Sequence, residues 1–361
     1  MTEADVVIVG GGPAGCSAAL ALVRHGLSVV IVSTPGRANK ITETSVPALA
    51  HLLRVLNVSQ ALEACEPCYG ICSTWGGVTQ ALSPSILQPQ GHSWFIHRGR
   101  FDVLLQHGAR ERGVVWLDAK ANDVRFEEDS VLLSTSAGPV MAQWLVTATG
   151  CPAWTARITG QTSVIDDSLI ALWMHLDQTP EERLLFVEAA DFGWWYLCPD
   201  DGCGAVACLI TDAETARDLG VAQCGVWSEL FNATSLAERL QGYASITKVQ
   251  GASTGISSLP LKHGDRWIAI GDAAAKLDPL GSSGTVTAID SGRRAAMAIK
   301  GALNGNRSAL EEYERWGSRL VSEFQRQRSQ HYLMERANRS SSFWKRRVSE
   351  RHVEEIHSAI H

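Results

Sequence analysis

Residues 4–32 read "ADVVIVGGGPAGCSAALALVRHGLSVVIV", which is the pattern of a strand, a glycine-rich turn, a helix and a second strand. The apolar run 6–9 has no polar residue, as is typical of a strand buried on both faces of a parallel sheet. Gly10, Gly12 and Gly15 follow this run with the spacing GxGxxG. The stretch therefore predicts a Rossmann-type unit that binds a dinucleotide.

The turn between the strand and the helix is expected to bind the phosphates. Gly10 permits a tight turn, Gly12 lets the main chain approach a pyrophosphate, and Gly15 lets the helix pack closely on the strand. The free N–H groups and the dipole of a helix N-terminus favour an anion there. We therefore expect the dinucleotide to contact a loop made of Gly10, Gly12, Pro13, Ala14 and Gly15.

The end of the second strand departs from the usual pattern. An acidic residue normally stands there and accepts hydrogen bonds from the adenosine ribose, but this chain has Ser33. A hydrogen bond to a charged group contributes about 1.5–3 kcal/mol. We therefore expect Ser33 to hold the adenosine half of the dinucleotide weakly.

The overall charge restricts the choice of partner. The chain has 361 residues and a formal net charge of −6, whereas nucleic acids and anionic membranes usually require a basic face. No apolar run approaches the roughly 18–20 residues of a membrane span, and the start "MTEADVVIVG" lacks a basic signal region. We expect a cytoplasmic protein with no nucleic-acid or membrane partner.

Three of the nine cysteines have a spacing that a metal could use. Cys65, Cys68 and Cys72 lie in "CEPCYGIC", but no second CxxC pair or helical HxxxH completes a tetrahedral site. We therefore expect no metal, and reduced thiols in a reducing compartment.

A second informative stretch is "GDAAAKLDPLGSSG", residues 271–284, which follows the apolar run "RWIAI". It resembles the second FAD motif of the para-hydroxybenzoate hydroxylase superfamily. The resemblance implies that Asp272 binds the ribityl chain of FAD and that Pro279 lies by the isoalloxazine. It also implies that the loop through Gly281 to Gly284 leads into a helix that points at the flavin. A polyol could donate to a buried carboxylate here; a helix cap before a surface loop is the alternative.

Two further segments match the same superfamily in order and spacing. "HRGRFDVLLQHGARERGV" resembles its segment Arg-x-x-Phe-Asp-x-x-Leu, which implies that Arg98 lies near the FAD phosphates. "QWLVTATG" resembles the strand that returns to the FAD domain, with Thr149 and Gly150 at its end. Because the chain has no second strand-GxGxxG-helix pattern, we expect no separate NAD(P)H domain.

Several short strings suggest a narrower group. They are similar to tryptophan-halogenase-like flavoproteins, which include the partners that mature cysteine tryptophylquinone in glycine and lysine oxidases. Flavin halogenases are expected to be longer and to carry a Trp-x-Trp-x-Ile-Pro string that this sequence lacks, so we expect no halogenation. The strings are "STWGG" at 73–77, "WFIHRGRFD" at 94–102, "ATGCPAWTAR" at 148–157, "EAADFGWWYLCP" at 188–199 and "SSFWKRR" at 341–347.

The resulting fold class is α/β: a Rossmann-type FAD-binding domain with an inserted antiparallel β-sheet substrate domain and a C-terminal helical segment. The FAD-binding domain is expected at 1–155 and 250–305, with part of 70–95 on the substrate side. The insert 155–250 alternates apolar and polar residues, which favours antiparallel strands. Residues 306–361 have helical spacing and would either pack on the body or dock a protein partner.

The expected activity is that of an FAD-dependent monooxygenase. The resemblance implies hydroxylation of a tryptophan in a partner protein, a quinoprotein precursor, during tryptophylquinone formation. The alternatives are a small-molecule aromatic or isoprenoid flavin monooxygenase or reductase, and a non-catalytic flavin-binding maturation factor. The electron donor, NAD(P)H or a reductase, stays open.

Four residues are candidates for direct participation in the reaction: Trp75, Trp195, Glu43 and Lys276. Glu43 would hold the flavin or a substrate N–H, or else cap a helix, and Lys276 would favour an anionic reduced flavin, or else lie on the surface. Adjacent strand residues face opposite ways, so only one of Trp194 and Trp195 should face the cavity. Further pocket candidates, each with a core position as its alternative, are Gly76, Trp94, His97, Trp194 and Tyr196.

Overall fold

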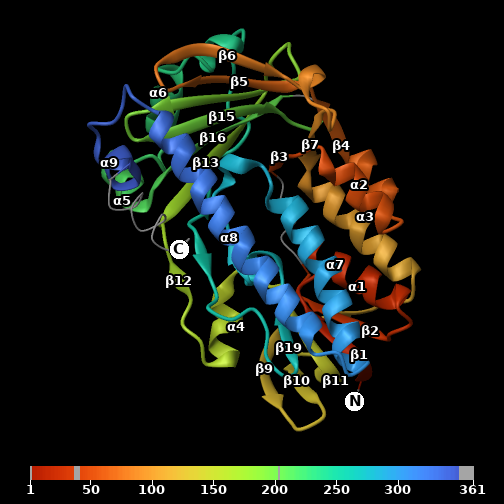
Figure 1. The fold of residues 1–361 in the computed structure, drawn as a ribbon. Coiled ribbons are helices and arrows are strands. Elements are labelled where there is room, and N and C mark those ends of the chain that lie inside the picture. Colours follow the sequence, from red (N-terminus) through yellow and green to blue (C-terminus); the bar gives the residue numbers. More distant parts are fainter. Residues whose placement is uncertain (1, 36–40, 202–203, 349–361) are drawn as a thin grey trace.

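Two large sheets and several long helices make up the described part of the chain, which is residues 2–35, 41–201 and 204–348 of this computed structural model (Figure 1). Each large sheet has seven strands, and two smaller sheets have three strands each. The chain thus has the mixed α/β architecture that the sequence predicted.

The first large sheet contains β1 Thr2–Val9, β2 Val29–Ser33, β8 Val115–Asp118, β9 Ala121–Phe126, β10 Val131–Thr135, β11 Gly138–Thr147 and β19 Trp267–Ala269. Its order is β8-β2-β1-β11-β10-β9, and β19 pairs with the end of β11. All neighbours are parallel except those that involve β10. Val6, Val7 and Ile8 of β1 are each 0% exposed, which confirms the predicted burial of this strand on both faces.

The second large sheet contains β5 Gly70–Trp75, β6 Val78–Pro84, β13 Leu169–Leu176, β14 Leu185–Ala190, β15 Gly193–Pro199, β16 Ala205–Asp212 and β17 Gln250–Ser253. Its order is β17-β13-β16-β15-β14-β5-β6, and only β14 and β5 are parallel neighbours. Helices α5 Ala213–Leu219 and α6 Cys224–Asn232 follow β16. Trp227 and Phe231 of α6 pack on Trp195 of β15, so α6 covers one face of this sheet.

The remaining elements connect the two large sheets. One small sheet contains β3 Thr42–Ser45, β7 Ser93–His97 and β4 Cys65–Cys68, and the other contains β12 Val164–Ile165, β18 Ser257–Ser258 and β20 Ala275–Lys276. The other helices are α1 Pro13–Arg24, α2 Ala48–Val55, α3 Arg98–Glu111, α4 Pro152–Thr159, α7 Gly284–Leu303, α8 Ser308–Met334 and α9 Ser342–Val348. Helix α8 runs from the first large sheet to the second (Figure 1).

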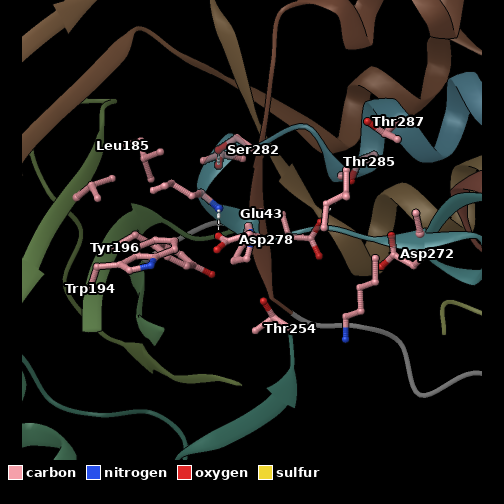
Figure 2. Close-up of a pocket in the computed structure, with 18 residues that line it drawn as sticks. Glu43, Leu185, Trp194, Tyr196, Thr254, Asp272, Asp278, Ser282, Thr285 and Thr287 are labelled. Atoms are coloured by element: carbon pink, nitrogen blue, oxygen red, sulfur yellow. Dashed lines mark hydrogen bonds between the residues drawn. The ribbon is translucent and has the colours of Figure 1, made fainter. Parts of the chain in front are cut away.

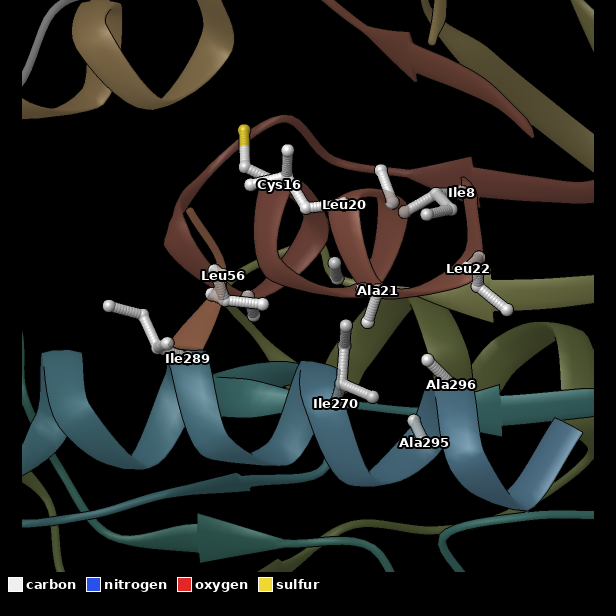
Figure 3. Packing of buried hydrophobic residues seen from close by; sticks show 14 of the residues in the cluster. Ile8, Cys16, Leu20, Ala21, Leu22, Leu56, Ile270, Ile289, Ala295 and Ala296 are labelled. Atoms are coloured by element: carbon white, nitrogen blue, oxygen red, sulfur yellow. The ribbon is translucent and has the colours of Figure 1, made fainter. Parts of the chain in front are cut away.

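Helices α1 and α7 pack directly on each other (Figure 3). Small and aliphatic side chains, among them Ala21 of α1 and Ala295 of α7, fill the layer between them. A Cβ atom on Gly292 would lie 2.4 Å from the carbonyl oxygen of Ala14, and Ser17 Oγ donates to the carbonyl of Ile289 at 2.6 Å. A Cβ atom at position 292 would therefore clash with the main chain of α1, and the two helices pack closely at this point.

The described C-terminal helices pack on the body of the protein. Trp344 of α9 is buried and donates through Nε1 to the carbonyl of Ala190 at 2.8 Å. Residues 349–361 of the predicted C-terminal segment lie outside the described residues. The described helices include none with the length and apolar character that a membrane span requires. The cysteines within the described ranges are free thiols, and no cluster of His, Cys, Asp or Glu there could hold a metal.

We predict that Gly292→Ala lowers the free energy of unfolding of the apoprotein by about 1–3 kcal/mol, because the added methyl overpacks the contact between α1 and α7. Gly225→Ala in α6 is the matched control, since a Cβ there meets no atom within 4 Å. That variant should gain up to about 1 kcal/mol of helix propensity. Urea denaturation measures both values, and equal effects of the two substitutions would contradict the close packing.

Candidate active site

A cleft opens where the N-termini of α1 and α7 meet. Gly12 and Ser283 are the N-cap residues of these helices, and neither supplies a side-chain cap. The first turns contain no acidic residue, so free N–H groups and two helix dipoles favour an anion in this cleft. The cleft is lined by Gly12, Pro13, Ala14, Glu43, Arg98, Ala148, Gly150, Ile270, Asp272, Gly284, Thr285 and Ala288.

The three glycines of the loop meet different surroundings. Gly10 has φ +114°, and a Cβ there would lie 2.1 Å from the Ala148 carbonyl oxygen. A Cβ on Gly15 would lie 2.0 Å from the carbonyl oxygen of Gly10, whereas one on Gly12 would meet nothing within 4 Å. Gly10 and Gly15 are therefore needed by the fold itself, and the space beside Gly12 is left for a ligand.

Arg98, the first residue of α3, places a positive charge in the same cleft. Its Nη1 donates to Glu43 Oε1 at 2.8 Å, and its Nε and Nη2 donate to the two carboxylate oxygens of Asp102 at 3.1 Å each. Burial lowers the pKa of Arg98, but the two carboxylates outweigh burial and raise this pKa above its ordinary value. The guanidinium therefore stays charged, and its predicted contact with the FAD phosphates stays a prediction.

Asp272 lies where the cleft continues into a second cavity, since it lines both. It sits in a 3-10 turn, Gly271–Ala273, which Gly271 ties to α7 by donating its N–H to Ser291 Oγ at 2.9 Å. Within the described residues, no group donates a hydrogen bond to the Asp272 carboxylate. Burial raises its pKa to about 6. A half-buried carboxylate without donors is costly, and a ligand that donates to it would relieve this cost.

The second cavity, of about 230 Å³, lies between the second large sheet and the loop that precedes α7 (Figure 2). Leu185 and Val187 of β14 and Trp194 and Tyr196 of β15 form its wall on the sheet side. Every second residue of a strand points to the same face of the sheet, which explains why Trp194 and Tyr196 both line the cavity. The opposite side is lined by Glu43, Thr44, Thr254, Asp272, Ala275, Lys276, Leu277, Asp278, Pro279, Leu280, Ser282, Gly284, Thr285 and Thr287.

The structure brings several predicted residues to this cavity. Glu43 lines both parts and accepts from Arg98 and, through Oε2, from Thr285 Oγ1 at 3.3 Å. Lys276 lines the second part, and its Nζ donates to the carbonyl of Ser253. Pro279 lines the same part. These positions agree with the predicted site, and the roles of the residues stay predictions.

Two predicted tryptophans lie elsewhere. Trp195 is 0% exposed and packs on Trp227, with ring centroids 5.1 Å apart, on the face of the sheet that α6 covers. Trp75 packs edge-on against Trp194 and Trp344, at 6.4 and 5.2 Å, and is not among the described residues that line the cavity. The prediction that Trp195 lines the cavity is therefore wrong, because strand alternation points this side chain at α6. Trp75 is partly buried against the aromatic cluster behind Trp194, and its role stays a prediction.

Other candidates also lie away from the cavity walls. Trp94 and His97 belong to the small sheet of β3, β7 and β4, and His97 Nδ1 is 3.0 Å from Thr42 Oγ1. Burial lowers the pKa of His97. The Gly76 N–H donates to Glu335 at 2.8 Å, in the turn between β5 and β6. These three residues are not among the described residues that line the two parts of the cavity.

The residues at the edges of the predicted dinucleotide site lie where the strands end. Ser33 closes β2, next in register to Asp118 of β8. Thr149 donates through Oγ1 to the carbonyl of Cys151 at 2.8 Å, and Gly281 lies in the 3-10 turn Pro279–Gly281. Sequence reasoning missed Thr285, whose only signal is its place in the first turn of α7, beside the predicted Gly284.

Comparisons with known proteins agree with this geometry. The chain matches the pyridine nucleotide-disulphide oxidoreductase family over residues 4–182. It is 27% identical to a protein named as an FAD-dependent oxidoreductase, LodB of Marinomonas mediterranea, over 96% of this chain and 97% of that protein. It is 25% identical, over 87% of this chain and 82% of the relative, to a Pseudoalteromonas luteoviolacea brominase named for 1H-pyrrole-2-carbonyl on a peptidyl-carrier protein.

Solved structures share the fold. The flavin-dependent brominase Bmp2 has a TM-score of 0.82 at 20% identity, covering 99% of this chain and 93% of its own. The peptidyl tryptophan dihydroxylase QhpG, essential for tryptophylquinone cofactor biogenesis, has a TM-score of 0.73 at 23% identity, covering 96% and 79%. Because Bmp2 is matched over nearly its whole chain, the expectation that flavin halogenases are longer is wrong for this brominase.

The fold, the glycine loop and these likenesses define the chain as an FAD-dependent oxidoreductase with a Rossmann-type FAD-binding fold. Within this class, the matches to LodB and to the flavin-dependent halogenases confirm its resemblance to the tryptophan-halogenase-like flavoproteins.

The residues of the cleft fit FAD. The open space beside Gly12 and the two helix N-termini suit the pyrophosphate, and the Asp272 carboxylate lacks a donor that ribityl hydroxyls would supply. When bound, FAD would supply the transfer of electrons to or from a substrate. The protein's part is to bind the cofactor and to limit the access of water to the cavity.

We predict that Ser33→Glu binds FAD roughly ten- to a hundredfold more tightly than the wild type, since it restores a charge-assisted hydrogen bond to the ribose. Ser33→Gln, which adds length without charge, is the control and should gain less. Gly12→Val should fold, because a Cβ atom at this position meets nothing within 4 Å in the apoprotein, but should bind no FAD. Flavin fluorescence titration measures the affinities of the wild type and of the three variants. A wild-type Kd below the nanomolar range would contradict weak adenosine binding.

We predict that Asp272→Asn stabilises the apoprotein at pH 7 and weakens FAD binding. The carboxyl has a pKa of about 6 when folded against 3.8 as its ordinary value, so the folded state binds more protons between these values. The free energy of unfolding of the wild type should therefore fall as pH rises through this window, by at most about 3 kcal/mol.

Thermal melts from about pH 4 to pH 8 test this prediction. The stability advantage of Asp272→Asn should be absent near pH 4, grow up to about pH 6 and stay constant above it. Asp129→Asn is the control, because it removes one carboxylate charge from a side chain that is 93% exposed. Equal stability of the wild type and Asp272→Asn at pH 7, or tighter FAD binding by the variant, would contradict the assignment.

Proposed function

We propose that this FAD-dependent oxidoreductase is a monooxygenase that hydroxylates a tryptophan of a partner protein, a quinoprotein precursor, during tryptophylquinone formation. The observation that carries the proposal is the cavity wall of Trp194, Tyr196, Leu185 and Val187, which faces the loop of the second FAD motif. The likeness to LodB and the fold shared with QhpG support the same activity.

The chain's own residues have three tasks in this proposal. The apolar wall excludes water and stacks on the substrate ring. Burial raises the pKa of Tyr196 well above its ordinary value, so its phenol stays neutral in this wall. Glu43 stands at the junction of the two parts of the cavity and would accept a hydrogen bond from the indole N–H, since carboxylate oxygens each accept more than one bond.

The small size of the cavity favours a single ring over a larger free ligand. Its volume is about 230 Å³, whereas sites for free drug-sized ligands have about 300–1,000 Å³. Ring stacking adds only about 0.5–1.5 kcal/mol beyond burial. Most of the affinity would therefore come from protein surface around the cavity, and free tryptophan should bind weakly.

A second candidate function is oxidation of a small aromatic ring. It is favoured by the likeness to the brominase named for a pyrrole on a carrier protein. The absence of the Trp-x-Trp-x-Ile-Pro string from the sequence argues against halogenation but leaves small-molecule hydroxylation open. A non-catalytic maturation factor is a third hypothesis, and it predicts no oxygen insertion by this protein.

Oxygen-18 labelling tests the proposal. We expect that co-expression with a candidate quinoprotein precursor under ¹⁸O₂ places ¹⁸O on one precursor tryptophan, detected by peptide mass spectrometry. Trp194→Leu should reduce labelling at least tenfold, because it removes the stacking wall. Trp316→Leu is the control, since this tryptophan lies on α8 against Tyr313 and Arg294, away from the cavity.

Each other outcome of this experiment points to a different function. Oxidation of free tryptophan or indole with a micromolar KM would favour the small-molecule enzyme. Chlorotryptophan formed with reduced FAD, oxygen and chloride would favour a halogenase. Quinone formation that needs the protein but is unaffected by Gly12→Val, which is expected to bind no FAD, would favour a factor that does not use its flavin.

A further inference from the structure

Asp278, one residue before Pro279 in the loop that faces the cavity, has a side chain that is 0% exposed and fully hydrogen-bonded. Its Oδ1 accepts from the Leu280 N–H at 2.9 Å, which holds the turn Pro279–Gly281. Its Oδ2 accepts from Arg328 Nε at 2.8 Å and from the Tyr332 hydroxyl at 3.1 Å. Both of these donors come from α8, some fifty residues further along the chain.

The Tyr332 hydroxyl links this loop to the cavity wall. It accepts a hydrogen bond from Trp194 Nε1 at 3.1 Å. An indole N–H can only donate, so the Tyr332 hydroxyl accepts from Trp194 and uses its own hydrogen to donate to Asp278 Oδ2. The polar edge of Trp194 is thereby turned toward Tyr332 while the indole lines the cavity.

The end of α8 that carries these residues is itself held in place. Arg328 also pairs with Asp167. Trp75 Nε1 donates to the His331 carbonyl at 3.0 Å, and the Gly76 N–H donates to Glu335 at 2.8 Å. These contacts anchor the end of α8 to the second large sheet. Through Arg328 and Tyr332, α8 therefore fixes the loop around Asp278 relative to that sheet.

We propose that Tyr332 and Arg328 are positioning residues, which fix the loop at Asp278–Pro279 and the indole of Trp194 on the two sides of the flavin cavity. Neither side chain is among the described residues that line this cavity, so they act through Asp278 and Trp194. The proposal rests on FAD binding alone and holds whether the substrate is a protein or a small molecule.

Tyr332→Phe tests the proposal. It keeps the ring that packs on Trp75 and Trp344 but removes one donor to Asp278 and the acceptor for Trp194. We expect a shift of the visible absorption bands of bound FAD and an affinity for FAD about three- to tenfold weaker, because the two lost hydrogen bonds act on FAD only through the loop at Asp278 and through Trp194.

Tyr313→Phe is the matched control on the same helix. The Tyr313 hydroxyl is also buried and donates to the Ala269 carbonyl at 2.7 Å, which lies in a strand and not in the loop. The melting temperatures of both variants should fall by a similar amount, but only Tyr332→Phe should change the flavin spectrum. A merely structural role predicts that neither variant changes it.

Arg328→Lys provides a second measurement. A lysine keeps the charge but cannot hold Asp278 and Asp167 with a planar fork, so the flavin bands should shift in the same direction as in Tyr332→Phe. Arg326→Gln, in an exposed pair with Glu323, is its control and should leave the spectrum unchanged. A Tyr332→Phe protein with the wild-type flavin spectrum and FAD affinity would overturn the proposal, whatever the outcome for Arg328→Lys.

Discussion

Helices α1 and α7 approach so closely at Gly292 that no methyl group fits beside the Ala14 carbonyl, and the cofactor site depends on this contact. It brings two helix N-termini to one cleft, where their free N–H groups and dipoles attract the same anion. Gly12, at the start of α1, leaves the space that the anion needs. A wider spacing of the helices would separate the predicted phosphate site beside Gly12 from the loop before Gly284.

Acidic side chains in the cleft balance the positive potential of the two helix N-termini, and one of them lowers the stability of the apoprotein. Arg98 is satisfied by Glu43 and Asp102, whereas Asp272 has no donor among the described residues and a raised pKa. Such strain is typical of a binding site, because a ligand with hydroxyl donors restores what the apoprotein lacks. We therefore expect the stability of the apoprotein and its affinity for FAD to be opposed at Asp272.

The second large sheet and the C-terminal helices build the other half of the site. The short strings that resemble the tryptophan-halogenase-like flavoproteins meet there: Trp75 of "STWGG" and Trp344 of "SSFWKRR" pack against each other and next to Trp194. The tryptophans of these strings thus have a packing role, since they form one aromatic cluster behind the cavity wall. In the described part of α9 this cluster, and not an exposed docking surface, accounts for the tryptophan.

The sequence by itself determined the features whose cause is local. The spacing of Gly10, Gly12 and Gly15 follows from the geometry of one turn, and the run 6–9 from burial on both faces, so both could be predicted without knowing the neighbours. Strand alternation likewise required that only one of Trp194 and Trp195 face the cavity. It could not say which one, because that depends on which face of the sheet α6 covers.

Only the tertiary structure decided the choices that depend on distant partners. Trp195 faces Trp227 of α6, and Asp278 faces Arg328 and Tyr332 of α8, pairs that are separated by tens of residues in the chain. The local sequence does not indicate such contacts, since an aspartate before a proline is typical of an ordinary turn. The physical reason is that hydrogen-bond and packing partners of a side chain are set by how helices lie on sheets, and not by the residues next to it.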